Sequence, residues 1–265
     1  MTERLADTRD LLTGWKLCTI SCCKQVMTVI RYLSKLIFPE RCIFCGKPTK
    51  LHSGNPYLCE SCAENMPYLR PNGEIDENSA VRGVSVFRYE AVKDTIFKFK
   101  YDGYKNYGKI LGKYMADYVI ENNICDVLEA DIIVPIPLWK KKEKERGFNQ
   151  SALLAEAVSD IIGIPFENEV LIRNRKTVPQ KGLSRSKRSD NLRGAFSLGK
   201  GSSVENKKVV IVDDIYTTGS TVYECSKILY GADADKVFYL ALSAPGTDIF
   251  EVEYTDKDVI KGFDE

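Results

Sequence analysis

One segment constrains the fold of this chain more than any other. Residues 209–221 read VVIVDDIYTTGST, in which an apolar run stops on two carboxylates and leads into a small, hydroxyl-rich loop. The continuous β-branched run at 209–212 predicts a strand that is buried on both faces of a parallel sheet. Asp213 and Asp214 then lie at the carboxyl end of that strand, where open α/β sheets bind their ligands. The segment therefore predicts an α/β fold with a ligand site at this strand end.

The loop after the acidic pair is suited to binding an anion. Gly219 lets the backbone turn closely around a ligand, and the free N–H groups at the start of the next helix face it. The neighbouring hydroxyls come from Thr217, Thr218, Ser220 and Thr221. Because the two carboxylates suit sugar hydroxyls or a magnesium ion, the segment predicts a ribose phosphate site. A plain surface turn after an ordinary strand is the competing interpretation.

The same residues resemble the phosphoribosyl pyrophosphate (PRPP) signature of type I phosphoribosyltransferases, with no mismatch at the acidic pair or the loop. The alternation of apolar segments from residue 81 onward agrees with a doubly wound, mostly parallel sheet of that kind. We predict strands at 84–89, 131–134, 169–172, 208–212 and 236–242. Helices are predicted at 92–99, 107–120 and 148–162, and from the hydroxyl-rich loop to residue 229.

Four cysteines form two close pairs, Cys42 with Cys45 and Cys59 with Cys62. Two such pairs separated by a short polar loop can converge on one tetrahedral zinc ion, with Zn–S distances of about 2.3 Å. The chain has an odd number of cysteines, 9, and we expect no cleavable signal peptide, so metal is favoured over disulfides. A small zinc ribbon is predicted at 40–70, in which a structural Zn²⁺ contributes most of the folding free energy.

The two ends of the chain differ from its middle. Apolar residues at helical spacing, with basic residues between them, predict an amphipathic helical extension at 1–39. We favour a helix packed on the body of the protein, and leave open a partner-binding helix or a basic helix on anionic lipid. A transmembrane span is disfavoured because charges interrupt every window of the required ~20 apolar residues. The main domain is predicted at 81–245, followed by an acidic C-terminal tail at 246–265.

Two basic segments are further candidates for binding anions. Residues 173–193 carry eight Lys or Arg against the single acidic residue Asp190, which predicts a mostly irregular, mobile flap over an anion. Residues 98–107 mix lysines with aromatic residues, which either stack the bases of a single strand or simply pack at a helix end. The candidate DNA contacts in these segments are Lys98, Lys100, Tyr101, Arg173, Arg175 and Arg188.

The motifs occur in one order: the cysteine pairs, the Lys-Tyr segment, VPIPL with RGFNQS, an RxRxTxxQ stretch and the PRPP signature. This combination resembles the ComF family of competence-associated, phosphoribosyltransferase-like proteins over about residues 42–244. The resemblance implies a cytoplasmic bacterial protein of natural transformation that handles imported single-stranded DNA. DNA-uptake proteins would be its partners, and peripheral attachment at the inner face of the membrane stays open.

The resemblance also implies roles for individual residues. In the phosphoribosyltransferase fold, the loop after the strand at 131–134 holds pyrophosphate, so Arg146 and Gly147 become candidates by position. Asp213 and Asp214 would hold the ribose hydroxyls. The other PRPP contacts would come from Lys100 and the loop residues Thr217, Thr218, Gly219, Ser220 and Thr221.

Whether the site is catalytic stays open. In a transferase, magnesium-bound PRPP would lose pyrophosphate through an oxocarbenium-like transition state, which Asp213, Asp214 and Arg146 would stabilise. The alternatives are a nucleotide-salvage phosphoribosyltransferase and a non-catalytic, PRPP-regulated module that binds DNA or a partner protein. The sequence predicts neither the acceptor nor the oligomeric state.

Overall fold

The computed structural model describes residues 41–49, 57–70, 72–76, 81–177 and 191–246. The chain divides into two compact units, with the boundary between Asn65 and Met66. The predicted extension at 1–39 lies outside the described residues, as do Arg188 and all but the first residue of the predicted acidic tail. Among the described residues, no helix has the length and apolar character needed to cross a membrane.

The first unit brings the two cysteine pairs together. Gly46 turns the chain with a φ of +70°, and its N–H donates to the Cys42 carbonyl at 2.9 Å. The N–H of Ile43 donates to the carbonyl of Tyr57 at 3.0 Å, which joins the two halves. The short helix α2 (Glu60–Glu64) begins directly after Cys59. The buried apolar residues described in this unit are Cys42, Ile43 and Leu58, a core too small to hold such a unit by itself.

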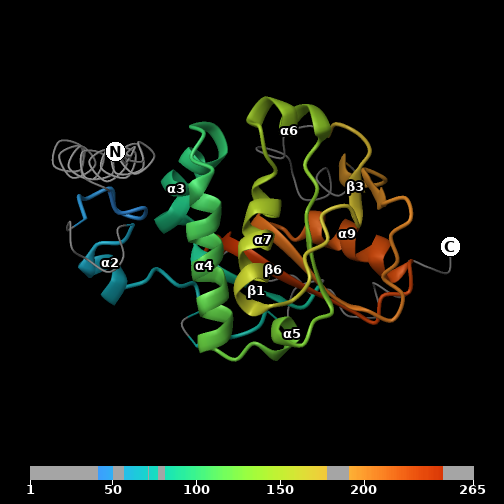
Figure 1. Ribbon diagram of the computed structural model, residues 1–265, viewed down its shortest axis with the longest axis horizontal. Helices are drawn as coiled ribbons and strands as arrows, with labels where there is room; N and C mark the ends of the chain where they lie inside the picture. The colour runs from blue at the N-terminus through green and yellow to red at the C-terminus, as the bar shows by residue number, and fades with distance from the viewer. Residues whose placement is uncertain (1–40, 50–56, 71, 77–80, 178–190, 247–265) are drawn as a thin grey trace, which may run out of the picture. The chain divides into compact units, whose positions relative to one another are not determined.

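The second unit is built on a parallel sheet (Figure 1). Its four strands lie in the order β1 (Gly83–Arg88), β6 (Lys236–Ala244), β5 (Lys208–Ile215) and β2 (Ile132–Pro135). Every neighbouring pair is parallel. An isolated parallel bridge between Ile133 and Phe166 continues the sheet beyond β2. The predicted α/β fold with a parallel sheet is confirmed.

Helices lie on both faces of the sheet, as in a doubly wound fold. The helices α3 (Tyr89–Tyr101), α4 (Asn106–Glu121) and α7 (Gln150–Ile162) cover one face (Figure 1). The helix α9 (Ser220–Tyr230) covers the other, together with an antiparallel pair, β3 (Leu171–Arg173) and β4 (Phe196–Leu198). Two shorter helices, α5 (Cys125–Leu128) and α6 (Lys140–Arg146), flank β2 along the chain.

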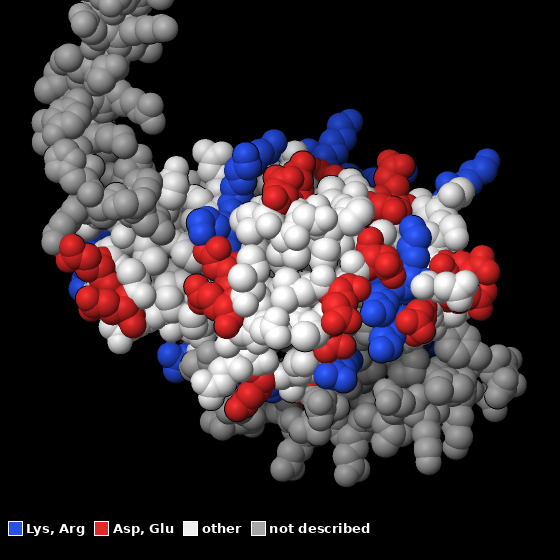
Figure 2. Space-filling view, turned by 60° about the horizontal axis from the view of Figure 1, so that its bottom comes forward, with Lys and Arg blue, Asp and Glu red and all other residues white. Residues whose placement is uncertain are grey.

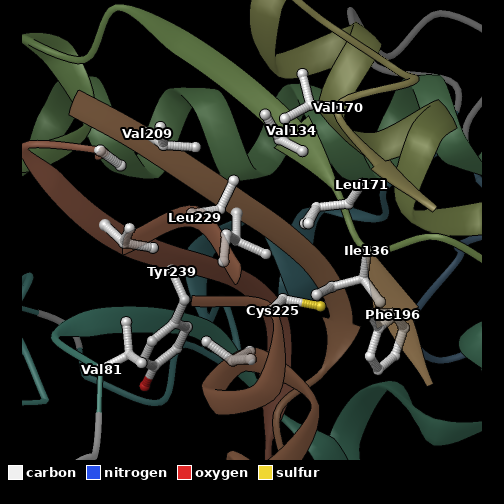
Figure 3. Packing of buried hydrophobic residues seen from close by; sticks show 14 of the residues in the cluster. Val81, Val134, Ile136, Val170, Leu171, Phe196, Val209, Cys225, Leu229 and Tyr239 are labelled. Atoms are coloured by element: carbon white, nitrogen blue, oxygen red, sulfur yellow. The ribbon is translucent and has the colours of Figure 1, made fainter. Parts of the chain in front are cut away.

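Val209 to Val212 are all buried, as the continuous β-branched run predicts. Successive side chains of a strand point to opposite faces, and Val209 and Ile211 join the core under α9. Figure 3 shows this core, in which sheet residues meet side chains from α9, β3 and β4. Its labelled members include Val134, Val209, Tyr239, Cys225, Leu229, Leu171 and Phe196.

On the opposite face, α4 approaches α7 closely. A Cβ atom on Gly112 would lie 2.6 Å from the Cβ of Ala157 and 2.9 Å from the Leu154 carbonyl oxygen. Any larger residue at this position would push the helices apart, so glycine sets the distance between them. This packing fixes α7, whose first residues reach the ligand site.

Several predicted boundaries differ from the structure. The signature strand continues through the acidic pair to Ile215, because Asp213 and Ile215 still pair with Ala241 and Ser243 of β6. The helix predicted from residue 148 begins at Gln150, because Asn149 caps it. The basic stretch 173–193 lies between two short strands: its first residue, Arg173, ends β3 and pairs with Phe196 of β4.

Candidate functional site

The acidic pair lies near the carboxyl end of β5, and its two carboxylates have different partners. Asp213 Oδ1 accepts hydrogen bonds from Ser151 Oγ at 3.0 Å and from the N–H of Asp214 at 2.8 Å. Asp214 is buried, and its Oδ2 forms an ion pair with Lys100 Nζ. Lys100 comes from the last turn of α3, so the pair joins two distant segments of the chain.

These partners drive the two carboxyl pKa values apart. For Asp213, burial and the adjacent charge of Asp214 raise the pKa from 3.8 to about 8. For Asp214, burial alone would raise the pKa, but attraction and hydrogen bonding to Lys100 lower it overall. The acidic pair thus disfavours two negative charges: the pKa of Asp213 is raised, and the charge of Asp214 is balanced by Lys100.

Directly after β5, the chain turns into α9 at Gly219. Gly219 has a φ of +71°, and a Cβ atom there would clash with the Tyr216 hydroxyl. The Tyr216 ring stacks on Tyr239 at 4.2 Å, which fixes its position. Thr218 Oγ1 and Ser220 Oγ lie 2.9 Å apart. No side chain caps the start of α9, so the N–H groups of its first turn are available to an anion.

Cations from three segments, α3, α6 and β3, surround the acidic pair. Arg146, at the end of α6, donates to Gln150 Oε1, and its guanidinium lies 5.3 Å from the centre of the Tyr101 ring. Partial burial and the nearby charges of Arg146, Lys100 and Arg173 lower the pKa of Lys142. The site is therefore a local concentration of positive charge, suited to a polyanion. The face seen in Figure 2 differs from it, because acidic and basic side chains are interspersed there around an uncharged area.

The start of α7 connects the loop after β2 to the acidic pair. Asn149 Nδ2 donates to the Ile136 carbonyl at 3.0 Å, and Asn149 Oδ1 accepts from the N–H of Ser151 at 3.1 Å. Ser151 in turn donates to Asp213. Asn149 and Ser151 are both buried. One turn of helix therefore holds the loop and one carboxylate in a fixed relation.

The four cysteines of the first unit converge. Their Sγ atoms all lie within 4.8 Å of one another, and those of Cys45 and Cys59 are 3.6 Å apart. A sulfur tetrahedron around zinc has edges of roughly 3.8 Å, given Zn–S distances of about 2.3 Å, whereas a disulfide needs about 2.05 Å. Burial would raise the pKa of Cys42, but N–H groups of Cys45, Cys59 and Phe44 lower it to about 7. The cluster fits one tetrahedral metal ion.

Magnesium does not fit the acidic pair as an ion held by the protein alone. Asp214 already has the Lys100 ammonium as its cation, and Asp213 Oδ1 already accepts two hydrogen bonds. Among the described residues, the one cluster of three or more metal-ligating side chains is the set of four cysteines.

Comparison with known proteins decides the family. The model of the phosphoribosyl transferase domain matches residues 149–263. "DNA utilization protein YhgH" of Escherichia coli (strain K12) is 31% identical over 233 residues, which cover 86% of this chain and 91% of that protein. "Competence protein F" of Haemophilus influenzae is 39% identical over 225 residues, or 77% of this chain and 97% of that protein. The chain belongs to the ComF family. A third relative, "Competence protein ComFC" of Bacillus subtilis, is 28% identical over 197 residues, or 74% of this chain and 73% of that protein.

In this ComF-family chain, the predicted PRPP residues come together only in part. Lys100, Arg146 and the acidic pair share electrostatic contacts, and the hydroxyl-rich loop follows the acidic pair directly along the chain. Gly147 ends α6 with a φ of +83°, and its carbonyl accepts from Lys105 Nζ at 3.2 Å. The sequence reasoning missed Ser151, Asn149 and Lys142, although RGFNQS contains the first two.

The described candidates for DNA contact in the ComF-family chain differ in burial and in their partners. Lys100 and Arg173 belong to the surroundings of the acidic pair. Arg175 is exposed and donates to the Arg193 carbonyl at 2.8 Å. Lys98 and Tyr101 lie exposed near the end of α3.

The aromatic residues at the end of α3 divide into packed and exposed ones. Phe99 is fully buried, and its ring lies 5.5 Å from that of Phe148. Phe97, Tyr101 and Tyr104 are instead 57%, 61% and 48% exposed. The centres of the Phe97 and Tyr101 rings lie 4.9 Å apart, and we call these two residues the aromatic platform.

Proposed function

We propose that this ComF-family protein binds PRPP at the carboxyl end of β5. The observation that carries the proposal is the acidic pair, with cations around it, followed by an uncapped helix start at Gly219. Carboxylates suit the two ribose hydroxyls, and a helix N-terminus suits a phosphate. PRPP is an anion that carries both groups on one sugar.

Each part of the ligand has a proposed partner. The ribose hydroxyls would donate to Asp213 and Asp214. The 5′-phosphate would accept from the first N–H groups of α9 and from the hydroxyls of the loop 217–221. Arg146 and the Gly147 turn would hold the pyrophosphate. Magnesium would be held by oxygens of PRPP, whose pyrophosphate charge it neutralises when bound.

The proposed chemistry is a phosphoribosyl transfer. The bond between C1 of the ribose and the pyrophosphate oxygen breaks, and its electron pair leaves with pyrophosphate. A nucleophile then forms a bond to C1, which carries positive charge in the transition state. Arg146 would stabilise the departing pyrophosphate, and the Asp214 carboxylate would face the positive sugar.

A second proposed function is the binding of single-stranded DNA, in the cytoplasm during natural transformation. The names of the relatives point to DNA utilization and competence, and the exposed aromatic platform supports the proposal because base stacking on such rings is sequence-tolerant. Lys98 beside the platform would contact phosphates. DNA-uptake proteins would be the partners that deliver the strand.

We also propose that the four cysteines hold a structural Zn²⁺. Four protein ligands fill a tetrahedral shell and leave no position for substrate. The small core of the first unit would then depend on the metal for its folding free energy.

Pyrophosphate release from PRPP tests the transferase proposal. The assay compares the wild-type protein with Arg146→Ala, with and without single-stranded DNA and the common bases. A loss of release in Arg146→Ala that exceeds the loss of PRPP affinity would support transfer, whereas PRPP binding without release under every condition would leave a binding module.

Salt dependence tests the DNA proposal. Tyr101→Ala should weaken binding of an oligothymidine by about 1–3 kcal/mol if a base stacks on that ring. Lys98→Ala should weaken binding and reduce its dependence on salt concentration. Exposed Lys113, on α4 and ion-paired with Asp117, provides the matched control Lys113→Ala. Equal DNA affinity at low and high salt would contradict the proposal.

A further inference from the structure

We propose that Lys100 is the resident cation of the acidic pair, and that it keeps the pair closed to free divalent metal ions. A phosphorylated sugar would open the pair by drawing Lys100 away, a part of the inference that rests on the proposed PRPP site. The buried ion pair between Lys100 Nζ and Asp214 Oδ2 carries the inference, because both side chains are largely removed from solvent, at 15% and 7% exposed.

The position of Lys100 is built into the end of α3. Lys98 and Lys100 lie in the last turn of the helix, where positive side chains are stabilised by the helix dipole. The next residue, Tyr101, lies against the guanidinium of Arg146. The ion pair with Asp214 holds the ammonium of Lys100 toward the sheet rather than toward solvent.

A buried ion pair is costly to form and still more costly to break on one side. If a divalent ion displaced Lys100 from Asp214, the ammonium would be left without its partner near Lys142, in a site where Asp214 also interacts with Arg146. The other carboxylate, Asp213, is already occupied through Oδ1 by Ser151 and a backbone N–H. A free metal ion therefore competes poorly for this pair.

A ligand with both hydroxyls and phosphates avoids this cost. Its hydroxyls can donate to Asp214 while its phosphate oxygens accept from the released ammonium, so both members of the ion pair keep a partner. Lys100 would thus select for a phosphorylated sugar over a bare cation. It acts as a specificity-determining residue of the site.

The probe for this inference is Mn²⁺ alone, without PRPP, added to the full-length protein with zinc bound. Free Mn²⁺ is counted by electron paramagnetic resonance. Lys100→Met should bind one Mn²⁺ at least tenfold more tightly than the wild type, and adding Asp214→Asn should abolish the gain. Lys93→Met removes an exposed charge from the same helix and should bind Mn²⁺ as weakly as the wild type.

Equal Mn²⁺ affinity of wild type and Lys100→Met would overturn the inference, as would tight binding by the wild type. If Lys100→Met fails to fold, Lys100→Arg and Lys100→Gln replace it. The arginine variant keeps the positive charge and should bind Mn²⁺ weakly, whereas the glutamine variant should bind it more tightly. Equal Mn²⁺ affinities of these two variants would overturn the inference. These measurements use no PRPP, so they are independent of the test of the proposed function. If the wild-type protein fails to bind PRPP, the proposed function is refuted, but the role of Lys100 is not decided.

Discussion

At the scale of single residues, the raised pKa of Asp213 makes the stability of the protein depend on pH. Below pH 3.8 its carboxyl is protonated in both the folded and the unfolded chain. Between pH 3.8 and about 8 only the folded protein keeps the proton, so the free energy of unfolding falls as pH rises through this range. Above about pH 8 the Asp213 carboxyl is charged in the folded state as well, beside the charge of Asp214.

Asp213→Asn should remove this loss, because the amide stays neutral and its oxygen can still accept from Ser151. We expect the variant and the wild type to have equal free energies of unfolding at pH 4, and the variant to be more stable by about 1–2 kcal/mol at pH 8. This gain is smaller than about 1.36 kcal/mol per unit of pKa shift would give, because Asp213 is only half-buried and solvent screens its charge. Urea unfolding followed by circular dichroism across this range measures the difference. A difference that does not change with pH would contradict the account.

Gly219 combines two requirements, a left-handed backbone and space beside Tyr216. Gly219→Ala should lower stability by about 1–2 kcal/mol through the left-handed strain alone, and it should also weaken PRPP binding because the clash displaces the helix start. Gly201→Ala is the matched control: its φ is +83°, with nothing within 4 Å of an added Cβ. It should lower thermal stability similarly and leave PRPP affinity, measured by calorimetry, unchanged. Unchanged PRPP affinity in Gly219→Ala would argue against phosphate binding there.

At the scale of elements, α7 depends on Asn149 for its start and for its connection to β2. Asn149→Ala removes the cap and leaves the buried Ile136 carbonyl without its donor, so a loss of about 1–3 kcal/mol is expected. Asn149→Ser keeps an oxygen for the cap but cannot reach Ile136, and it should recover about 1 kcal/mol of that loss. Thermal unfolding compares the two variants. Equal stabilities would show that the cap contributes nothing.

The sequence predicted elements well where local pattern decides them. The β-branched run at 209–212 is buried on both faces, and the helix after Gly219 starts where the loop predicts. The local sequence pattern could not predict the contacts of the site. Lys100 contacts Asp214, and Ser151 contacts Asp213, only because α3 and α7 pack on the sheet. Lys142 lies in a run of Lys and Glu residues, a composition typical of a solvated surface, and α6 has no buried residues.

At the scale of the whole molecule, the chain combines a small unit that contains four converging cysteines with a larger unit that has its own core. Removing zinc should unfold the first unit and leave the cooperative unfolding of the second. Cys59→Ser should lose metal and reproduce the effect, whereas Cys125→Ser, an exposed thiol outside the cluster, should not. Zinc content and differential scanning calorimetry measure both. Loss of the whole transition on chelation would contradict separate units.

The central claim is a PRPP site at the end of β5, and calorimetric titration of PRPP with magnesium into the zinc-loaded protein tests it most directly. The account predicts saturable binding at one site per chain, abolished in the combined variant Asp213→Asn and Asp214→Asn. Absence of binding to the wild type, or equal binding to the folded double variant, would contradict it.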